Sequence, residues 1–275
     1  MRLKISIRLG KNSNRRRHEC KKVTNNVIMS AFLWKFVAND FAYGITDKSD
    51  VMENFALEHL IGLPLFQGVG RSELAQFSSY IPHKIVKYAD GEVIAADEAS
   101  CNRLAVVFHG VVEVKGTAAN SRFAVREKLC APVAIQPEAL YGISPRFTYT
   151  YTAAGEVRTL EIPKAGVTML FSRFEVFRLN LVNLLATIVC RQRRWLWRDQ
   201  TGTLEKRIAD FILAHCIYPA GEKRIEITKE NLGNQVNDTR FNVTCALKRM
   251  KEAGVLELRR GRILIPKAER LIQLA

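Results

Sequence analysis

The most constraining feature of this chain is a stretch near its C-terminal end, Ile225–Met250, which reads IEITKENLGNQVNDTRFNVTCALKRM. Apolar residues lie four apart at Leu232 and Val236, and they recur at spacings of four and three from Val243 onward. Such spacings predict two helices, each with one apolar face. The polar QVNDTRF between them leaves room only for a tight turn, so the helices must cross steeply, as in a helix-turn-helix. An ordinary helical hairpin in a protein core is the alternative.

The predicted turn carries residues suited to a helix boundary. Asn237 tolerates a left-handed backbone, and either Asp238 or Thr239 can cap the helix that follows. Thr228 is placed to cap the first helix of the pair. The turn chemistry therefore agrees with the apolar spacing.

Segments on both sides extend this pair of helices into a larger pattern. An amphipathic helix, LEKRIADFILAHC, precedes it, and PAGEKRIEI then predicts a turn and a short strand. After it, LELRRGRILIP predicts two short strands about Arg260-Gly261. Helix, strand, two helices and a basic hairpin make a winged helix-turn-helix. We assign it to residues 201–275, after a polar hinge, and it indicates DNA binding.

The middle of the chain has a different periodicity. Between Ile81 and Pro163 lie short segments rich in β-branched and aromatic residues: KIVKY, EVIAA, RLAVVF, VVEVKG, RFAVREKL, FTYTYTA and EVRTLEI. Turn signals such as Asp90-Gly91 and His109-Gly110 separate them. Short strands at this spacing predict an antiparallel barrel or jelly roll over residues 52–163. The stretch APVAIQPEALYGISP should interrupt it with a loop or a short helix.

A long helix is predicted between these two parts, over residues 164–200. Its apolar residues recur close to alternating fours and threes, which is typical of a seam that packs against a second helix. We expect a homodimer through this helix, with packing on its own roll as the alternative. The predicted interface residues are Phe177, Leu181, Leu184, Ile188 and Trp195.

Charge and composition narrow the class of partner. The formal net charge is +15 and the pI near 9.8, a balance that suits a polyanion such as double-stranded DNA. No apolar run is long enough to span a membrane, so we expect a cytoplasmic protein without a membrane partner. The six cysteines are scattered and none forms a CxxC pair, so no metal site and no cofactor are expected.

The first part of the chain, residues 1–51, differs from the rest. It joins the basic run KNSNRRRHECKK to the apolar stretch VIMSAFLWKFV. We expect a basic extension that is disordered or translated from an upstream start codon. A DNA-binding arm and a membrane-surface helix are the alternatives.

The order of these parts resembles the Crp/Fnr (cAMP receptor protein and fumarate-nitrate regulator) family of transcription factors. YADGEVIAADEASCNRLAVVFHGVVEV is similar to the glycine-marked strand pattern of the family's roll, and ITKENLGNQVNDTRFNVTCALKRMKEAGVLEL matches its helix-turn-helix without a gap. The resemblance implies an α+β fold: an N-terminal antiparallel β-roll of the cyclic-nucleotide-binding type, a long dimerisation helix and a C-terminal winged helix-turn-helix. It also implies a homodimer that regulates transcription, with RNA polymerase as a further partner.

The effector cassette departs from the family's pattern. Members that bind cyclic nucleotides carry a Gly-Glu pair for the ribose and an Arg-Ser pair for the cyclic phosphate. Here the first pair falls on Ile135 and Gln136, and the second on Arg146 and Phe147, with Glu138 nearby. Without the carboxylate the ribose hydroxyl loses a charge-assisted acceptor, so we expect that cAMP is not the effector. A small-molecule effector pocket would still include Gln136, Glu138, Arg146 and Phe147.

Residues that contact DNA are expected on the second helix of the motif and on its hairpin. The N-terminal part of a recognition helix enters the major groove, and the guanidinium of Arg240 can bind guanine O6 and N7. Phe241 and Cys245 stand where the best-known member of the family has a glutamate and an arginine. The full predicted set is Lys229, Thr239, Arg240, Phe241, Asn242, Thr244, Cys245, Lys248, Arg260 and Arg262.

An enzyme built on the roll is the competing class. A cupin-like metal site needs closely spaced histidines, whereas His83 and His109 lie far apart. No GxSxG, HExxH or GxxxxGK[ST] motif occurs, so an enzyme would need a dispersed site. We therefore predict no catalytic residues. A DNA-binding protein that works without a ligand is the remaining alternative.

Overall fold

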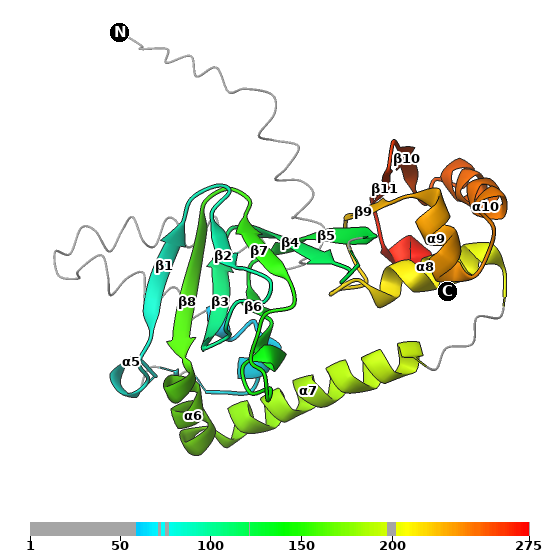
Figure 1. The fold of residues 1–275 in the computed structure, drawn as a ribbon. Coiled ribbons are helices and arrows are strands. Elements are labelled where there is room, and N and C mark those ends of the chain that lie inside the picture. The colour runs from blue at the N-terminus through cyan, green and yellow to red at the C-terminus, as the bar shows by residue number, and fades with distance from the viewer. Residues whose placement is uncertain (1–58, 71–72, 75–76, 121, 197–201, 275) are drawn as a thin grey trace, which may run out of the picture. The chain divides into compact units, whose positions relative to one another are not determined.

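The structure is a computed structural model, and it describes residues 59–70, 73–74, 77–120, 122–196 and 202–274 (Figure 1). The basic extension predicted over residues 1–51 lies outside them. No helix in the described part of the chain is long and apolar enough to cross a membrane.

The middle of the chain folds into an antiparallel roll of two facing sheets (Figure 1). One sheet has the order β1-β8-β3-β6, and the other contains β5-β4-β7-β2. All seven predicted strand segments are confirmed, and the sequence analysis missed the short β6. The strands are β1 (Lys84–Tyr88), β2 (Val93–Ala95), β3 (Arg103–His109), β4 (Val111–Thr117), β5 (Phe123–Cys130), β6 (Val133–Ile135), β7 (Thr150–Ala153) and β8 (Val157–Pro163).

The roll closes because its strands alternate and its turns hold glycine where the backbone is left-handed. In β4, buried Val112 and Val114 alternate with half-exposed residues, so one face of the strand lines the core. Gly110, between β3 and β4, has φ +99°, and a Cβ there would lie 2.4 Å from the Glu156 carbonyl oxygen. In the interruption, β6 is followed by the one-turn helix η3 (Pro137–Ala139).

The predicted long helix is two helices, α6 (Lys164–Arg173) and α7 (Glu175–Leu196), separated by the extended residue Phe174. Phe177 is 1% exposed and Leu181 3% exposed, and both belong to the core of the roll. The Phe177 ring lies 5.1 Å from that of Phe66 in the short helix η2 (Pro64–Phe66). The short helix α5 (Phe77–Tyr80) adds Phe77 to the same core.

This packing corrects the predicted dimer seam. Phe177 and Leu181 cannot face a partner subunit because they already face their own roll, which was the alternative in the sequence analysis. Leu184 and Ile188 are half-buried on α7, with Leu184 packed against the roll core. The side chain of Trp195 lies outside the described part of the structure.

The C-terminal part has the predicted winged helix-turn-helix order. Its core unites the apolar faces of the helices, among them Leu232, Val236, Val243, Leu247 and Met250, which are all buried. The pairing of β10 with β11 forms the wing. The elements are α8 (Leu204–Ala214), β9 (Lys223–Ile227), α9 (Lys229–Val236), α10 (Arg240–Glu252), β10 (Glu257–Arg259), β11 (Arg262–Ile265) and α11 (Glu269–Ile272).

The roll and the winged helix-turn-helix share a sheet, which the sequence analysis did not predict. Strand β9 pairs antiparallel with β5, from Phe123 opposite Ile227 to Glu127 opposite Lys223. The second sheet of the roll therefore continues through β9 into the wing, in the order β10-β11-β9-β5-β4-β7-β2 (Figure 1). Val125 of β5 also belongs to the core of the C-terminal part.

Candidate nucleic-acid interface

The turn between α9 and α10 has the geometry that its residues predict. Thr228 caps α9, its hydroxyl accepting from Asn231 N–H at 3.1 Å, and Thr239 caps α10 by accepting from Asn242 N–H at 3.2 Å. Asn237 is left-handed, with φ 52°. These three expectations are confirmed, and they place the N-terminus of α10 immediately after the turn.

Helix α8 holds the turn from behind, through a residue that the sequence analysis missed. Arg207 donates from Nη1 to the Val236 carbonyl oxygen at 2.7 Å and from Nη2 to Asp238 Oδ2 at 2.6 Å. A hydrogen bond from Asn242, another from the Thr239 N–H and the ion pair with Arg207 hold the pKa of the Asp238 carboxyl below its usual range. The start of α10 is thus fixed by both side chain and backbone.

A second contact from α8 steadies the far end of α10. Arg249 lies on α10 and donates from Nε to Glu205 Oε1 of α8 at 2.6 Å. The pKa of the Glu205 carboxyl is lowered: its partial burial, which works the other way, is outweighed by hydrogen bonds and by the Arg249 charge. Arg207 thus ties the turn before α10 to α8, and Arg249 ties the C-terminal part of α10 to the same helix.

The outward face of α10 is open. Arg240 is exposed at the first helical position, and Phe241 is 76% exposed. Thr244 and Cys245 are half-exposed one turn later, and Lys248 is exposed beyond them. The structure therefore brings the predicted reading residues onto one accessible face. Asn242 lies beside them, and its side-chain amide donates one hydrogen bond to Asp238 Oδ1 at 2.8 Å.

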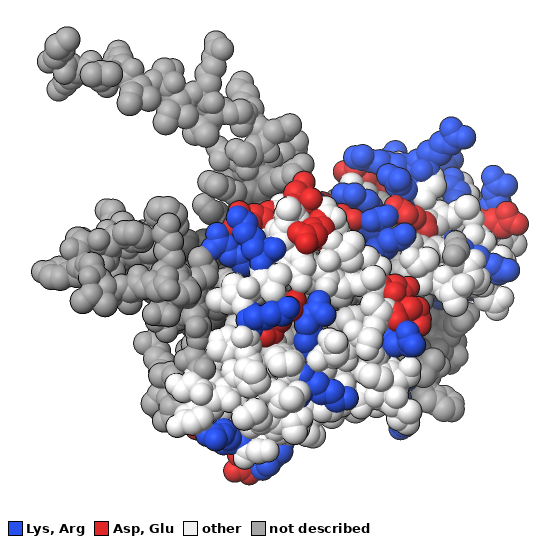
Figure 2. Space-filling model, turned by 60° about the vertical axis from the view of Figure 1, so that its left-hand side comes forward, with Lys and Arg blue, Asp and Glu red and all other residues white. Residues whose placement is uncertain are grey.

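Cations crowd the wing beside this helix. Arg259, Arg260 and Arg262 are all exposed around the turn at Gly261. Arg259 lies 3.6 Å from Glu257, and Arg262 lies 3.9 Å from Glu226, so both pairs are loose. Residues 206–274 contain 14 Lys and Arg against eight Asp and Glu. Figure 2 shows one face of the molecule, on which Lys and Arg gather most densely at the upper right.

A tightly capped turn, an exposed second helix and a basic wing define a winged helix-turn-helix of the DNA-binding kind. Residues 206–274 match the model of the Crp-like helix-turn-helix domain. The resemblance stated from the sequence is confirmed for it. No curated protein sequence matches the chain.

Solved structures of Crp/Fnr regulators are among those similar to the chain. The catabolite activator protein of Thermus thermophilus is 19% identical, with a TM-score of 0.40, over 78% of this chain and 98% of that one. A CRP/FNR-family transcriptional regulator, also of Thermus thermophilus, is 22% identical, with a TM-score of 0.41, over 70% and 98%. The c-di-GMP-responsive global regulator CLP of Xanthomonas campestris is 13% identical, with a TM-score of 0.41, over 72% and 99%.

The four predicted effector residues differ in burial and in the contacts that they make. Phe147 is 2% exposed within the roll core. The Gln136 amide is buried, donating to Thr148 Oγ1 at 2.9 Å and accepting from Thr148 N–H at 3.0 Å. Arg146 is exposed and donates to the Glu98 carbonyl oxygen at 2.7 Å. Glu138 lies in η3, where burial raises the pKa of its carboxyl.

A buried ion pair lies where β5 meets β9. Glu127 is 3% exposed and accepts at 2.6 Å from Nζ of Lys223, which is 1% exposed. The same carboxylate accepts from the Ile217 N–H at 2.6 Å, and Arg191 of α7 donates to the Ile217 carbonyl oxygen at 3.0 Å. The segment that leads from α8 to β9 is therefore held by the roll and by α7 together.

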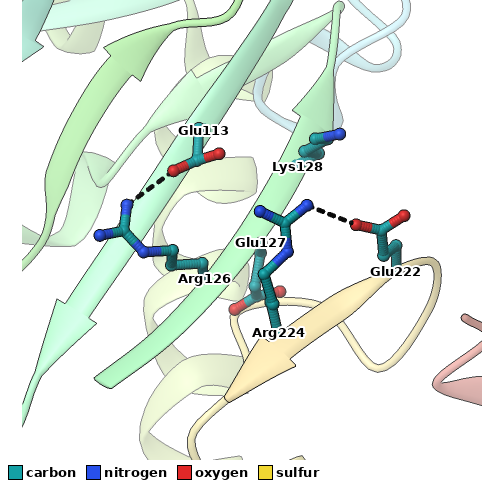
Figure 3. Close-up of a pocket in the computed structure, with 6 residues that line it drawn as sticks. All are labelled: Glu113, Arg126, Glu127, Lys128, Glu222 and Arg224. Atoms are coloured by element: carbon teal, nitrogen blue, oxygen red, sulfur yellow. Dashed lines mark hydrogen bonds and ion pairs between the residues drawn. The ribbon is translucent and has the colours of Figure 1, made fainter. Parts of the chain in front are cut away.

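The hollow beside this pair is small and charged. Figure 3 shows its lining, in which Arg126 of β5 pairs with Glu113 at 2.7 Å and Arg224 of β9 with Glu222 at 3.1 Å. The hollow has about 10 Å³ of free volume, room for about one water molecule. It serves as a joint between the strands, and it has no room for an effector.

Proposed function

We propose that the protein is a sequence-specific DNA-binding transcriptional regulator of the Crp/Fnr type. The observation that carries the proposal is the exposed N-terminal half of α10 within a Crp-like helix-turn-helix domain. In this motif the second helix enters the major groove with its N-terminal residues against the base edges.

Contacts to bases and contacts to phosphates fall on different residues. Arg240 reads a base by bidentate donation to guanine, and Phe241 and Cys245 offer apolar contact to neighbouring bases. Phosphate contacts position the protein without reading sequence. We assign them to Lys229, Thr239, Asn242, Lys248, Arg260 and Arg262, while Thr244 stays among the candidates for base contact.

The regulator acts as a homodimer through the outward face of α7. Leu179 is 55% exposed, Val182 53% and Val189 48%. With exposed Ala186 they recur at three, four and three, the spacing of a two-helix seam, on the side of α7 away from buried Phe177. A two-fold pair of such helices presents two recognition helices to a palindromic operator.

Cyclic AMP is not the effector of this regulator. The ribose and phosphate positions are occupied by buried Ile135 and Phe147, and the Gln136 amide is already satisfied by Thr148. Titration calorimetry of the full chain with cAMP should show no heat at micromolar concentrations and no change in DNA affinity. Micromolar binding accompanied by a rise in DNA affinity would contradict this.

The protein acts by binding DNA and not by catalysis. It does so in the cytoplasm, and RNA polymerase is its further partner there. The experiment that tests the proposal is selection of sites from random double-stranded DNA with the full chain. We expect an inverted repeat with half-site centres about 10 base pairs apart or a multiple of that. A pool without any enriched sequence would contradict the proposal.

A further inference from the structure

Three chain segments meet in one row at an end of the shared sheet. The register of β5 and β9 places Arg122, just before β5, opposite Thr228, the cap of α9. On the other side of β9, the Ile227 N–H donates to the Gly261 carbonyl oxygen of the wing turn at 3.2 Å. The tip of the β4–β5 hairpin, the N-terminus of α9 and the wing turn are therefore neighbours.

The hairpin tip is anchored to the helix-turn-helix. Asn231, in the first turn of α9, donates from its side-chain amide to the Arg122 carbonyl oxygen at 3.1 Å. The backbone N–H of Arg122 donates to Asn120 Oδ1 at 3.1 Å, which closes the turn of the hairpin. Both anchors use main-chain atoms of Arg122, so its side chain is not needed for either.

The side chain of Arg122 is exposed, and among the described residues its guanidinium has no ion-pair partner. Arg260 is likewise exposed and unpaired in the described part of the chain. Glu226, the acid on the intervening strand, is already held by Arg126 at 3.2 Å. The row therefore presents Arg122 and Arg260, two cations without an ion-pair partner among the described residues, beside the positive N-terminal end of α9, whose first turn also carries the exposed Glu230.

Its dimensions suit a DNA backbone. Neighbouring strands lie about 4.8 Å apart, so Arg122 and the wing turn are separated by two strand spacings, about 10 Å. One DNA strand carries a phosphate about every 3.4 Å of helix axis. The row is thus long enough to contact neighbouring phosphates of one strand.

We propose that the β4–β5 hairpin of the roll is part of the DNA interface, with Arg122 as a phosphate contact in line with Lys229 and Arg260. This inference rests on the proposed function, since it extends the same interface. The hairpin joins two strands of the roll. A phosphate contact through Arg122 therefore makes the roll a participant in DNA binding.

The test is the salt dependence of DNA binding by the full chain, measured for Arg122→Ala on the preferred site and on random DNA. Removal of one phosphate contact lowers the slope of log K against log salt by about 0.9 per subunit. We expect this decrease on both DNAs, and we expect Arg122→Lys to restore the slope. The matched control is Lys128→Ala, an exposed cation six residues further along β5.

The outcomes separate this inference from the proposed function. Wild-type binding together with equal slopes for Arg122→Ala and Lys128→Ala would overturn the inference alone. A wild-type chain that shows no specific DNA binding would overturn both. Unchanged thermal unfolding of Arg122→Ala, combined with the reduced slope and its recovery in Arg122→Lys, would support the inference.

Discussion

A single glycine sets how closely α9 approaches the turn of the motif. A Cβ at Gly233 would lie 2.6 Å from the Asp238 carbonyl oxygen, closer than any side chain tolerates. The Asp238 N–H donates to the Gly233 carbonyl oxygen at 2.9 Å, so the turn is tied to the same residue. Gly233→Ala must therefore push the turn, and with it the start of α10, away from α9.

We expect Gly233→Ala to lower the free energy of unfolding by about 1–3 kcal/mol, as overpacking does, and to weaken DNA binding. Urea unfolding and binding titrations measure the two effects. Asn234→Ala is the control, because Asn234 is the next residue on α9 and is exposed. If both variants behave alike, the close approach at Gly233 is not important for the turn.

Local residue chemistry could be predicted from the sequence, but partners far apart in the chain could not. Thr228, Asn237 and Thr239 act on backbone groups within three or four residues, so their roles follow from local rules. Arg207 binds Asp238 from 31 positions away. Nothing in an amphipathic helix indicates which of its cations turns back toward the fold.

At the scale of elements, the joint between β5 and β9 depends on a charge at an inward position. Glu127 lies two residues from buried Val125 and two from buried Leu129, so all three share the inward face of β5. Lys223 shares the inward face of β9 with buried Ile225 in the same way. Two complementary charges out of place in two strand patterns are the signal that could have predicted the pairing. Which edge strand receives β9 is a long-range choice that neither pattern contains.

Removal of one partner from a buried ion pair leaves an uncompensated charge, which costs about 3–5 kcal/mol. We expect Glu127→Ala to lower the free energy of unfolding by an amount in this range. Glu113→Ala on the neighbouring strand is the control, since its pair with Arg126 is partly exposed and worth under about 1 kcal/mol. Equal losses in urea unfolding would show that the buried pair does not hold the joint.

Helix α7 shows why the dimer face proposed from the structure differs from the one predicted from the sequence. Both Phe177 with Leu181 and Leu179 with Val182 fit a helical spacing, so the helix has apolar residues on two sides. Only the packed structure shows which side the roll takes. Leu184 was also predicted on the seam, and it is half-buried against the same roll.

The exposed side of α7 leads to a specific prediction about assembly. Leu179→Asp combined with Val182→Asp should give a folded monomer, because two charges would be buried in the seam, and operator affinity should fall when the linked second half-site no longer contributes. Sedimentation and DNA titration measure both. Thr187→Asp, exposed on the same helix outside the seam, should remain dimeric. A dimeric double variant would contradict the assignment.

At the scale of the whole molecule, the order of parts was predictable because each part has its own periodicity. Alternation predicted the roll, and helical spacing with turn chemistry predicted the helix-turn-helix. The shared sheet was not predictable, since it joins strands that lie far apart in the sequence, such as Ala124 and Glu226. It implies that the roll, through β5, supports the same surface that is proposed to bind DNA.

One comparison tests directly whether α10 reads the DNA sequence while the wing only positions the protein on the DNA. Binding of Arg240→Ala and Arg260→Ala should be measured on the preferred site and on random DNA at several salt concentrations. Arg240→Ala should cost about 1–3 kcal/mol on the preferred site and relax preference at one base pair. Arg260→Ala should weaken binding to both DNAs alike and lower the salt slope by about 0.9 per subunit. If Arg240→Ala instead lowers both affinities equally, Arg240 contacts only the backbone and α10 is not the reading helix.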